Sequence, residues 1–284
     1  MKKSIKKLLS SLVPAIMLLS LFTGCEPNGP LPDYNSIIEN ASFQKSAKND
    51  DFEYSVYDTY VEITKYIGSS TDVSIPSEIE NLPVYVIGGF GSTNSNESLI
   101  TSVTIPYGVG IISENAFAYC KRLESVSMPN SVVKIESGAF ALCSRLDSIK
   151  LGNNLKTIED NAFLSCSSLK EIKIPDSVTQ VGVYAFANCH QLGSVEIGKG
   201  ITKIDQHTFQ ECSSILKITI PENVTEIGLD AFASTNLQSI TIKGMDVEMR
   251  SCGLSSRTNT IVYGYENSTV QAFCERNNMV FKPI

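Results

Sequence analysis

The chain has 284 residues, of which 42% are hydrophobic, and its formal net charge is −7. That length allows one or two ordinary folded domains. The acidic charge argues against nucleic acid as a partner, because an acidic surface repels phosphate backbones.

Residues 1–24 have the features of an export signal. Four lysines precede the mostly apolar run Leu8–Phe22, which is too short to cross a bilayer as a helix. Thr23 and Gly24 then precede Cys25, and this ending resembles the lipobox of bacterial lipoproteins. The resemblance implies a lipoprotein signal peptide and a lipid on Cys25; the alternative is ordinary secretion with an incidental thiol. Removal of the signal takes away four lysines and no acids, so the charge falls from −7 to −11.

The next segment is rich in Pro, Asn, Ser and Lys. Pro27, Pro30 and Pro32 stand close together, and apolar residues show little periodicity. Such a composition predicts a flexible tether over residues 25–51, which holds the rest of the chain away from the membrane.

Phenylalanine recurs every 23 residues through the middle of the chain. The surrounding residues recur too, as AFAYC, AFALC, AFLSC, AFANC and TFQEC. The repeated positions are Phe117, Phe140, Phe163, Phe186, Phe209 and Phe232. A fixed period of this length predicts a solenoid whose rungs stack on one another, because a single rung buries too little to be stable alone.

Each repeat has two limbs. Apolar residues alternate after each Phe, as in Val126 and Met128, and a Pro or Gly follows, which predicts a short strand that then ends. In the other limb, Ala139, Phe140 and Cys143 share the spacing of one helical face. We therefore expect about seven regular parallel strands on one side, about 30 to 35 Å in all, and irregular or one-turn helical segments opposite.

The repeat resembles the leucine-rich repeat of BspA-like surface proteins, with its pattern L-x-x-V-x-I-P, V-x-x-I and A-F-x-x-C. Leu169–Pro175, Val178–Val181 and Ala185–Cys189 reproduce that pattern. The resemblance implies an α/β solenoid of the leucine-rich repeat type, and adhesion to host matrix proteins, other cells or polymers.

The two ends of the repeat region depart from this pattern. We expect an N-terminal cap and an irregular first repeat over residues 52–98, with a hairpin at its start, and regular repeats over residues 99–243. Residues 244–284 are expected to form a C-terminal cap, in which Ser268 opens a helix. The polar run before Leu99 is either a contact loop or sequence drift.

The residues for catalysis or metal binding are few. His190 and His207 are the two histidines, and they occupy different columns of the repeat, so we expect both at the surface. A nucleophilic Ser or Cys needs a base within hydrogen-bond reach, and the repeat register brings no such partner to either histidine. We therefore predict no enzyme activity, no cofactor and no metal site.

Five cysteines share one column of the repeat: Cys120, Cys143, Cys166, Cys189 and Cys212. We expect them to be buried free thiols that pack as small hydrophobic side chains. Cys252 and Cys274 lie near the C-terminus, and the sequence does not decide whether they form a disulfide.

The outward positions of the strands form two polar columns. They are the candidate ligand face, against the alternative of a merely solvated surface. The residues are Ser102, Thr104, Ser125, Ser127, Ser148, Lys150, Glu171, Lys173, Ser194, Glu196, Lys217 and Thr219. These columns hold no Tyr or Trp for stacking on sugar rings, which favours a solvated face over a formed glycan site and leaves open a protein partner that meets a broad, polar sheet.

Together these observations predict an extracytoplasmic, membrane-anchored lipoprotein, displayed at the cell surface. Its partners would be the membrane, through the lipid on Cys25, and a protein or polysaccharide ligand. The alternative function is that of a structural or accessory protein of the cell envelope.

Overall fold

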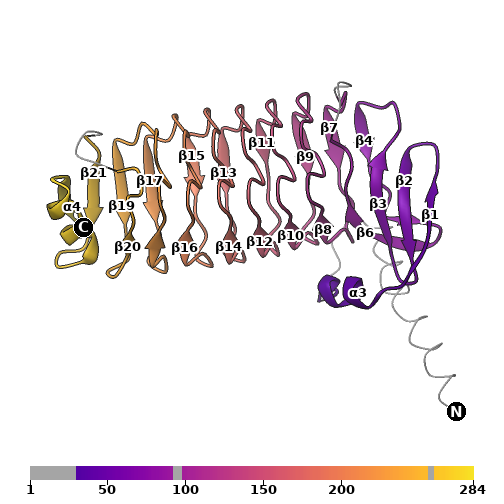
Figure 1. Ribbon diagram of the computed structural model, residues 1–284, viewed down its shortest axis with the longest axis horizontal. Coiled ribbons are helices and arrows are strands. Elements are labelled where there is room, and N and C mark those ends of the chain that lie inside the picture. Colours follow the sequence, from indigo (N-terminus) through magenta and orange to yellow (C-terminus); the bar gives the residue numbers. More distant parts are fainter. Residues whose placement is uncertain (1–29, 92–97, 255–258) are drawn as a thin grey trace, which may run out of the picture.

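The computed structural model describes residues 30–91, 98–254 and 259–284. The chain winds into an elongated solenoid of about nine coils with parallel sheets and little helix (Figure 1). The predicted signal peptide, Cys25 and most of the polar run before Leu99 lie outside the described residues. No helix in the described parts is long and apolar enough to span a membrane.

One parallel ladder consists of the expected strands, and we call it the long-strand ladder. Its members pair in the orders β11-β9-β7-β4, β13-β15 and β17-β19-β21-β22. Their bounds are β4 Asp72–Ser74, β7 Ser102–Thr104, β9 Ser125–Ser127, β11 Ser148–Ile149, β13 Glu171–Lys173, β15 Ser194–Glu196, β17 Lys217–Ile220, β19 Ser239–Ile242, β21 Ile261–Gly264 and β22 Val280–Pro283. The register between successive rungs is one full repeat, as in Ser125 opposite Ser148.

A second parallel ladder runs beside the first, and we call it the short-strand ladder. It consists of β6 Leu82–Ile87, β8 Ile111–Ile112, β10 Lys134–Ile135, β12 Thr157–Ile158, β14 Gln180–Val181, β16 Lys203–Ile204, β18 Glu226–Ile227 and β20 Glu248–Met249. Strands this short carry no alternation that a sequence can reveal. The second limb of each repeat was expected to be irregular or helical, and this expectation was wrong, because the limb contains a short parallel strand.

The A-F-x-x-C segments are turns, not helical turns. The N–H of Phe140 donates to the carbonyl of Ala162 in the next rung at 2.8 Å. Asn161 and Ser165, two residues before and after Phe163, have φ of 57° and 60°, which a right-handed helix excludes. The one-turn helix was therefore a wrong prediction, because the backbone groups of this limb bond between rungs.

The core is a set of columns that run the length of the solenoid. The Phe rings are almost fully buried and stack with interplanar angles of 8° or less from Phe117 to Phe232. Leu123, Leu146 and Leu169 form another fully buried column. Residues that recur at the repeat interval in the sequence therefore lie next to one another in these columns.

The N-terminal end contains antiparallel strands. β1 Phe43–Lys48, β2 Phe52–Tyr57 and β3 Val61–Tyr66 pair in that order, which confirms the hairpin expected after residue 52. β3 then pairs in parallel with β6, while β5 Glu78–Ile79 pairs with β6 in the antiparallel sense. The short-strand ladder therefore continues without a break into this hairpin.

The expected tether is corrected by α3, Tyr34–Asn40, which docks beside the short-strand ladder near β6 and β8 (Figure 1). Tyr34 is 2% exposed and packs in one cluster with Tyr60 and Tyr85. Gly110 permits the contact, because a Cβ there would overlap the Tyr34 ring. These partners are far away in the sequence, so local composition predicted a flexible segment where the chain folds.

The C-terminal elements follow the prediction. The hydroxyl of Ser268 accepts a hydrogen bond from the N–H of Gln271 at 3.1 Å and so caps α4, Thr269–Arg276. Val270, Phe273 and Cys274 on α4 are buried. β22 then joins β21 in parallel.

Candidate functional site: the long-strand face

The outward side chains of the long-strand ladder form a polar surface, which we call the long-strand face. Of the twelve residues predicted for it, all are exposed except Ser102, which is half-buried. The residues between them, such as Val103 and Ile172, are buried. The two-residue period of the strands thus separates an inward and an outward column, as expected.

The structure brings nine of the twelve predicted residues into hollows on this face. A hollow of about 480 Å³ is lined by Ser125, Ser148, Lys150, Glu171, Lys173, Ser194 and Glu196. A second, of about 580 Å³, lies over β15 and β17 and shares Ser194 and Glu196, adding Lys217 and Thr219. Ser102, Thr104 and Ser127 line neither.

An ion pair stands where the two hollows meet. The Nζ of Lys173 lies 2.8 Å from the Oε2 of Glu196, and this hydrogen bond raises the pKa of Lys173. Both side chains are largely exposed, and exposed pairs contribute little to stability. The pair therefore contributes to the charge of the rim between the two hollows and adds little to the stability of the fold.

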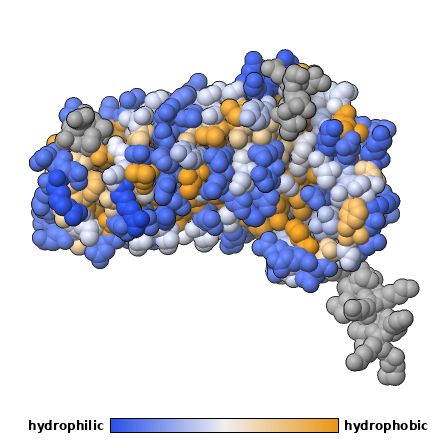
Figure 2. Space-filling view, viewed as in Figure 1, coloured by the Kyte–Doolittle hydropathy of each residue, from blue (hydrophilic) through white to orange (hydrophobic). Residues whose placement is uncertain are grey.

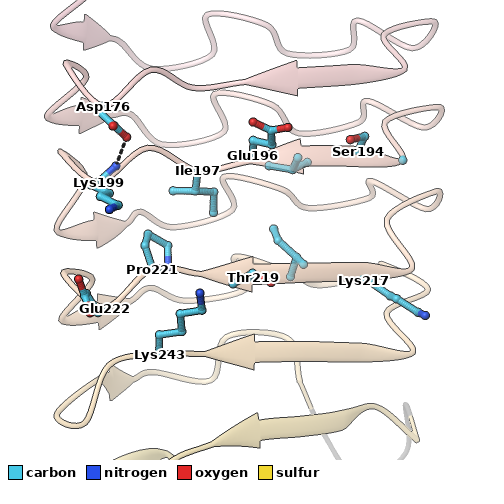
Figure 3. Close-up of a pocket in the computed structure, with 13 residues that line it drawn as sticks. Asp176, Ser194, Glu196, Ile197, Lys199, Lys217, Thr219, Pro221, Glu222 and Lys243 are labelled. Carbon is cyan, nitrogen blue, oxygen red and sulfur yellow. Dashed lines mark hydrogen bonds between the residues drawn. The ribbon is translucent and has the colours of Figure 1, made fainter. Parts of the chain in front are cut away.

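The larger hollow includes residues that the sequence did not single out. Lys199, Glu222 and Lys243 stand in the turns that follow the strands, and with Asp176 they surround one end of the hollow (Figure 3). The Oδ1 of Asp176 accepts a hydrogen bond from the N–H of Lys199 at 2.8 Å. Charges of both signs therefore lie close together at this end of the hollow. All four residues follow shortly after a strand of the long-strand ladder, and this shared position in the repeat could have identified them from the sequence.

The family described as the BspA type leucine rich repeat region matches residues 90–206 and 134–252, in six copies, which covers more than half of the chain. The chain belongs to the BspA-type leucine-rich repeat family. A search of curated protein sequences found no significant match.

Solved structures of bacterial leucine-rich repeat proteins resemble this BspA-type solenoid. One from Bacteroides ovatus is 24% identical over 77% of this chain and 70% of its own, with a TM-score of 0.58. The leucine-rich repeat protein of T. pallidum is 26% identical over 67% of this chain and 89% of its own, with a TM-score of 0.58. These likenesses support the fold.

The cysteine column of the BspA-type rungs is buried and unpaired, as predicted. Each thiol has a further role that the sequence did not reveal. The Sγ of Cys166 lies 3.2 Å from the carbonyl oxygen of Phe140 in the preceding rung, and Cys143 and Cys189 repeat this contact. Because a thiol is a weak donor, the column supplies S–H bonds between rungs as well as packing.

Burial also changes the acidity of these thiols. It raises the pKa of Cys120 to about 11 and that of Cys212 to about 12, and it raises the pKa of Cys166 well above its ordinary value. The nucleophilic and oxidisable form is the thiolate. The column is therefore chemically quiet at neutral pH.

The two histidines have separate surroundings. His190 is exposed, and its Nδ1 lies 3.0 Å from the carbonyl oxygen of Glu211. His207 departs from the expectation of a surface position, since it is half-buried and its ring stacks on Tyr184 at a centroid distance of 4.4 Å. Across the three described ranges, no three His, Cys, Asp or Glu side chains gather as a metal ion would require.

The remaining cysteines were left open by the sequence. Cys252 and Cys274 are both buried and free in the structure. Burial raises the pKa of each to about 11. Cys25, the predicted lipidation site, lies outside the described residues.

Proposed function

We propose that this chain is a non-enzymatic, lipid-anchored binding protein of the cell surface that contacts a protein or polysaccharide ligand through its long-strand face. The observation that carries the proposal is the pair of adjoining hollows on that face. They are broad, and each is lined by charged side chains of both signs together with apolar residues such as Ile172 and Ile218. Such a surface suits recognition of a macromolecule better than enclosure of a small substrate.

The export signal and Cys25 support the proposed location. Lipidation of Cys25 would place the solenoid outside the cytoplasm and on a membrane. The family adds that this is a repeat protein of the kind that presents an extended surface. The resemblance to BspA-like surface proteins is the reason to propose adhesion rather than an internal role in the envelope.

Binding by the long-strand face can be tested with a matched pair of charge reversals. Lys150→Glu changes the rim of the smaller hollow, whereas Lys156→Glu makes the same change beside β12 in the short-strand ladder. The full-length chain would be assayed on immobilised fibronectin, collagen and peptidoglycan. Loss of retention with Lys150→Glu alone supports the proposal, and equal retention by both variants contradicts it.

The location has its own test. The Cys25→Ala variant should leave the membrane fraction or accumulate as a precursor, because one residue would carry the lipid. Protease added to intact cells should digest the unaltered protein. If the protein is protected in intact cells but digested after lysis, it faces inward, and an accessory role in the envelope replaces surface binding.

A further inference from the structure

The outward columns of the long-strand ladder change in character near the C-terminus. From β7 to β17, the twelve outward residues of the candidate ligand face are all Ser, Thr, Lys or Glu. On β21 and β22 the same columns hold Ile261, Tyr263 and Val280, since β19, β21 and β22 pair in register. Ser239 on β19 lies beside Ile261, which lies beside Val280. The polar face therefore becomes apolar in its last rungs.

These apolar residues adjoin one another, and we call them the C-terminal apolar patch. Val280 is 52% exposed, Ile284 50% and Tyr265 40%. The N–H of Ile284 donates to the carbonyl of Gly264 at 3.0 Å, so Ile284 continues the register of β22 beside Tyr265. The patch consists of Ile261, Tyr263, Tyr265, Val280 and Ile284.

The arrangement of the patch distinguishes it from ordinary surface. Scattered apolar side chains are normal on a folded protein, and on the side drawn in Figure 2 they lie in small groups among hydrophilic residues. The five residues of the patch instead lie together on the outer side of two paired strands. The terminal repeats of a solenoid normally carry a polar outer surface, which keeps the protein soluble. Adjoining apolar side chains at this end therefore indicate a contact surface.

Charged side chains of both signs surround the patch. Lys243 follows β19 and Lys282 lies on β22, whereas Asp246 and Glu266 stand in the connections after β19 and β21. All four are exposed, and none of them forms an ion pair with another described residue. A surface with an apolar centre and two charges of each sign around it is complementary to a second copy of itself.

We propose that the C-terminal apolar patch binds a second copy of this chain, face to face, about a two-fold axis that runs parallel to β21. Such an axis places Tyr263 against its counterpart and brings β22 of one copy opposite β19 of the other. Lys282 of one copy then lies on the side where the other copy carries Asp246. The two solenoids point in opposite directions and overlap in their last three rungs, so the hollows of the long-strand face stay open for a ligand.

Two other ways of covering this end fit less well. Strand addition at the free edge of β22 is hindered by Pro283, which has no N–H to donate to a further strand. A sugar needs hydrogen-bond partners for its hydroxyl groups, and the side chains of Ile261, Val280 and Ile284 offer none. Contact between three rungs is small, so the dimer should be weak in solution and form more readily when both copies share one membrane.

Sedimentation velocity of the full-length chain in detergent, at about 5 to 500 µM, measures this dimer. Val280→Glu places two carboxylates in the contact, because two-fold symmetry repeats every substitution. The dissociation constant should therefore rise by about a hundredfold, about tenfold for each copy. Gln180→Glu adds the same charge at an exposed position of β14 in the short-strand ladder, and it should leave the constant unchanged.

Cross-linking tests the orientation of the two copies. Ile261→Cys in a Cys25→Ala background places a thiol near the two-fold axis, while the seven other cysteines are buried. A short bismaleimide should join two copies of this variant but not of Gln180→Cys in the same background. A monomer at every concentration, an unchanged constant in Val280→Glu, or equal cross-linking of both cysteine variants overturns the inference. If a monomeric chain loses retention on fibronectin, collagen or peptidoglycan with Val280→Glu, the patch belongs to the ligand site and the dimer is likewise refuted.

Discussion

The regular rungs and the N-terminal segment are stabilised by different kinds of contact. In the rungs, each Phe, Leu or Cys packs against its own kind one repeat away. In α3, Tyr34 packs against Tyr60 and Tyr85, and it fits only because position 110 is glycine. Contacts between stacked rungs therefore appear in the sequence as residues repeated at a fixed interval. The contacts of a segment that docks only once do not repeat, so no interval in the sequence indicates them.

The largest effect should come from the centre of the stack. Phe163→Ala leaves a cavity between Phe140 and Phe186, so the free energy of unfolding should fall by about 3 to 5 kcal/mol. Denaturant unfolding of the variant measures this loss. Lys150→Ala on the exposed face is the control and should change stability by less than about 0.5 kcal/mol. Equal effects would mean that the inward and outward columns are wrongly assigned.

Docking of α3 should be lost without loss of the stack. Tyr34→Ala removes a buried ring, so α3 should undock at a local cost of about 2 to 4 kcal/mol, less than the loss at Phe163 in the stack. Hydrogen exchange and limited proteolysis of residues 34–48 would report it. Tyr34→Phe is the control: the hydroxyl is buried without a partner, so its removal should not weaken docking. Unchanged protection in Tyr34→Ala would contradict the docked arrangement.

A smaller effect is expected in the cysteine column. Cys166→Ala removes the S–H bond to Phe140 and should cost about 1 to 2 kcal/mol. In the unaltered chain Cys166 should resist alkylation until the protein is denatured, as mass spectrometry can show. Ready labelling of the native thiol, or a disulfide to Cys143, would overturn the buried-thiol assignment.

The same thiols predict a dependence of stability on pH. Burial raises their pKa above the ordinary value of 9.0, so the folded chain retains these protons when the unfolded chain loses them. The free energy of unfolding is therefore unaffected by them below about pH 9 and falls as the pH rises further. Cys166→Ala should reduce this alkaline loss in denaturation series between about pH 8 and 11, and an identical slope in both proteins would contradict it.

The smallest effect concerns the rim of the hollows. Lys173→Ala breaks the pair with Glu196, yet both side chains are largely exposed, so stability should change by less than about 0.5 kcal/mol. Thermal unfolding would measure it, with Lys156→Ala as the control. A loss of several kcal/mol would show that the long-strand face holds the fold rather than being free for binding.

The accuracy of the sequence predictions follows from the same contrast. The columns of Phe163 and Cys166, and the outward position of Lys173, repeat at a fixed interval, so their places inside or outside could be predicted. The short-strand ladder could not, because two-residue strands such as Lys134–Ile135 show no alternation. The helix at Tyr34 could not, because its partners lie 26 or more residues away.

The candidate site was predicted in part for a similar reason. Ser194, Glu196, Lys217 and Thr219 follow from strand alternation. The apolar floor of the larger hollow at Val195 and Ile197 does not, because both occupy inward columns that are buried in most other rungs. Its exposure goes with a wider spacing of the rungs at Phe209, where the Phe rings stand 5.7 and 5.8 Å from their neighbours, and the repeat period does not reveal that spacing.

The docking of α3 sets how far the solenoid can reach. Only five residues separate Cys25 from Leu31, the first residue that packs with the Tyr34 cluster. The six steps from one Cα to the next between them span about 20 Å when fully extended, whereas the 26 steps of a free tether over residues 25–51 could span about 90 Å. A lipid on Cys25 would therefore keep the N-terminal end of the solenoid at the bilayer surface. Ligands would have to come close to the membrane or contact the far end of the solenoid, because so short a linker cannot carry the binding face far from the bilayer.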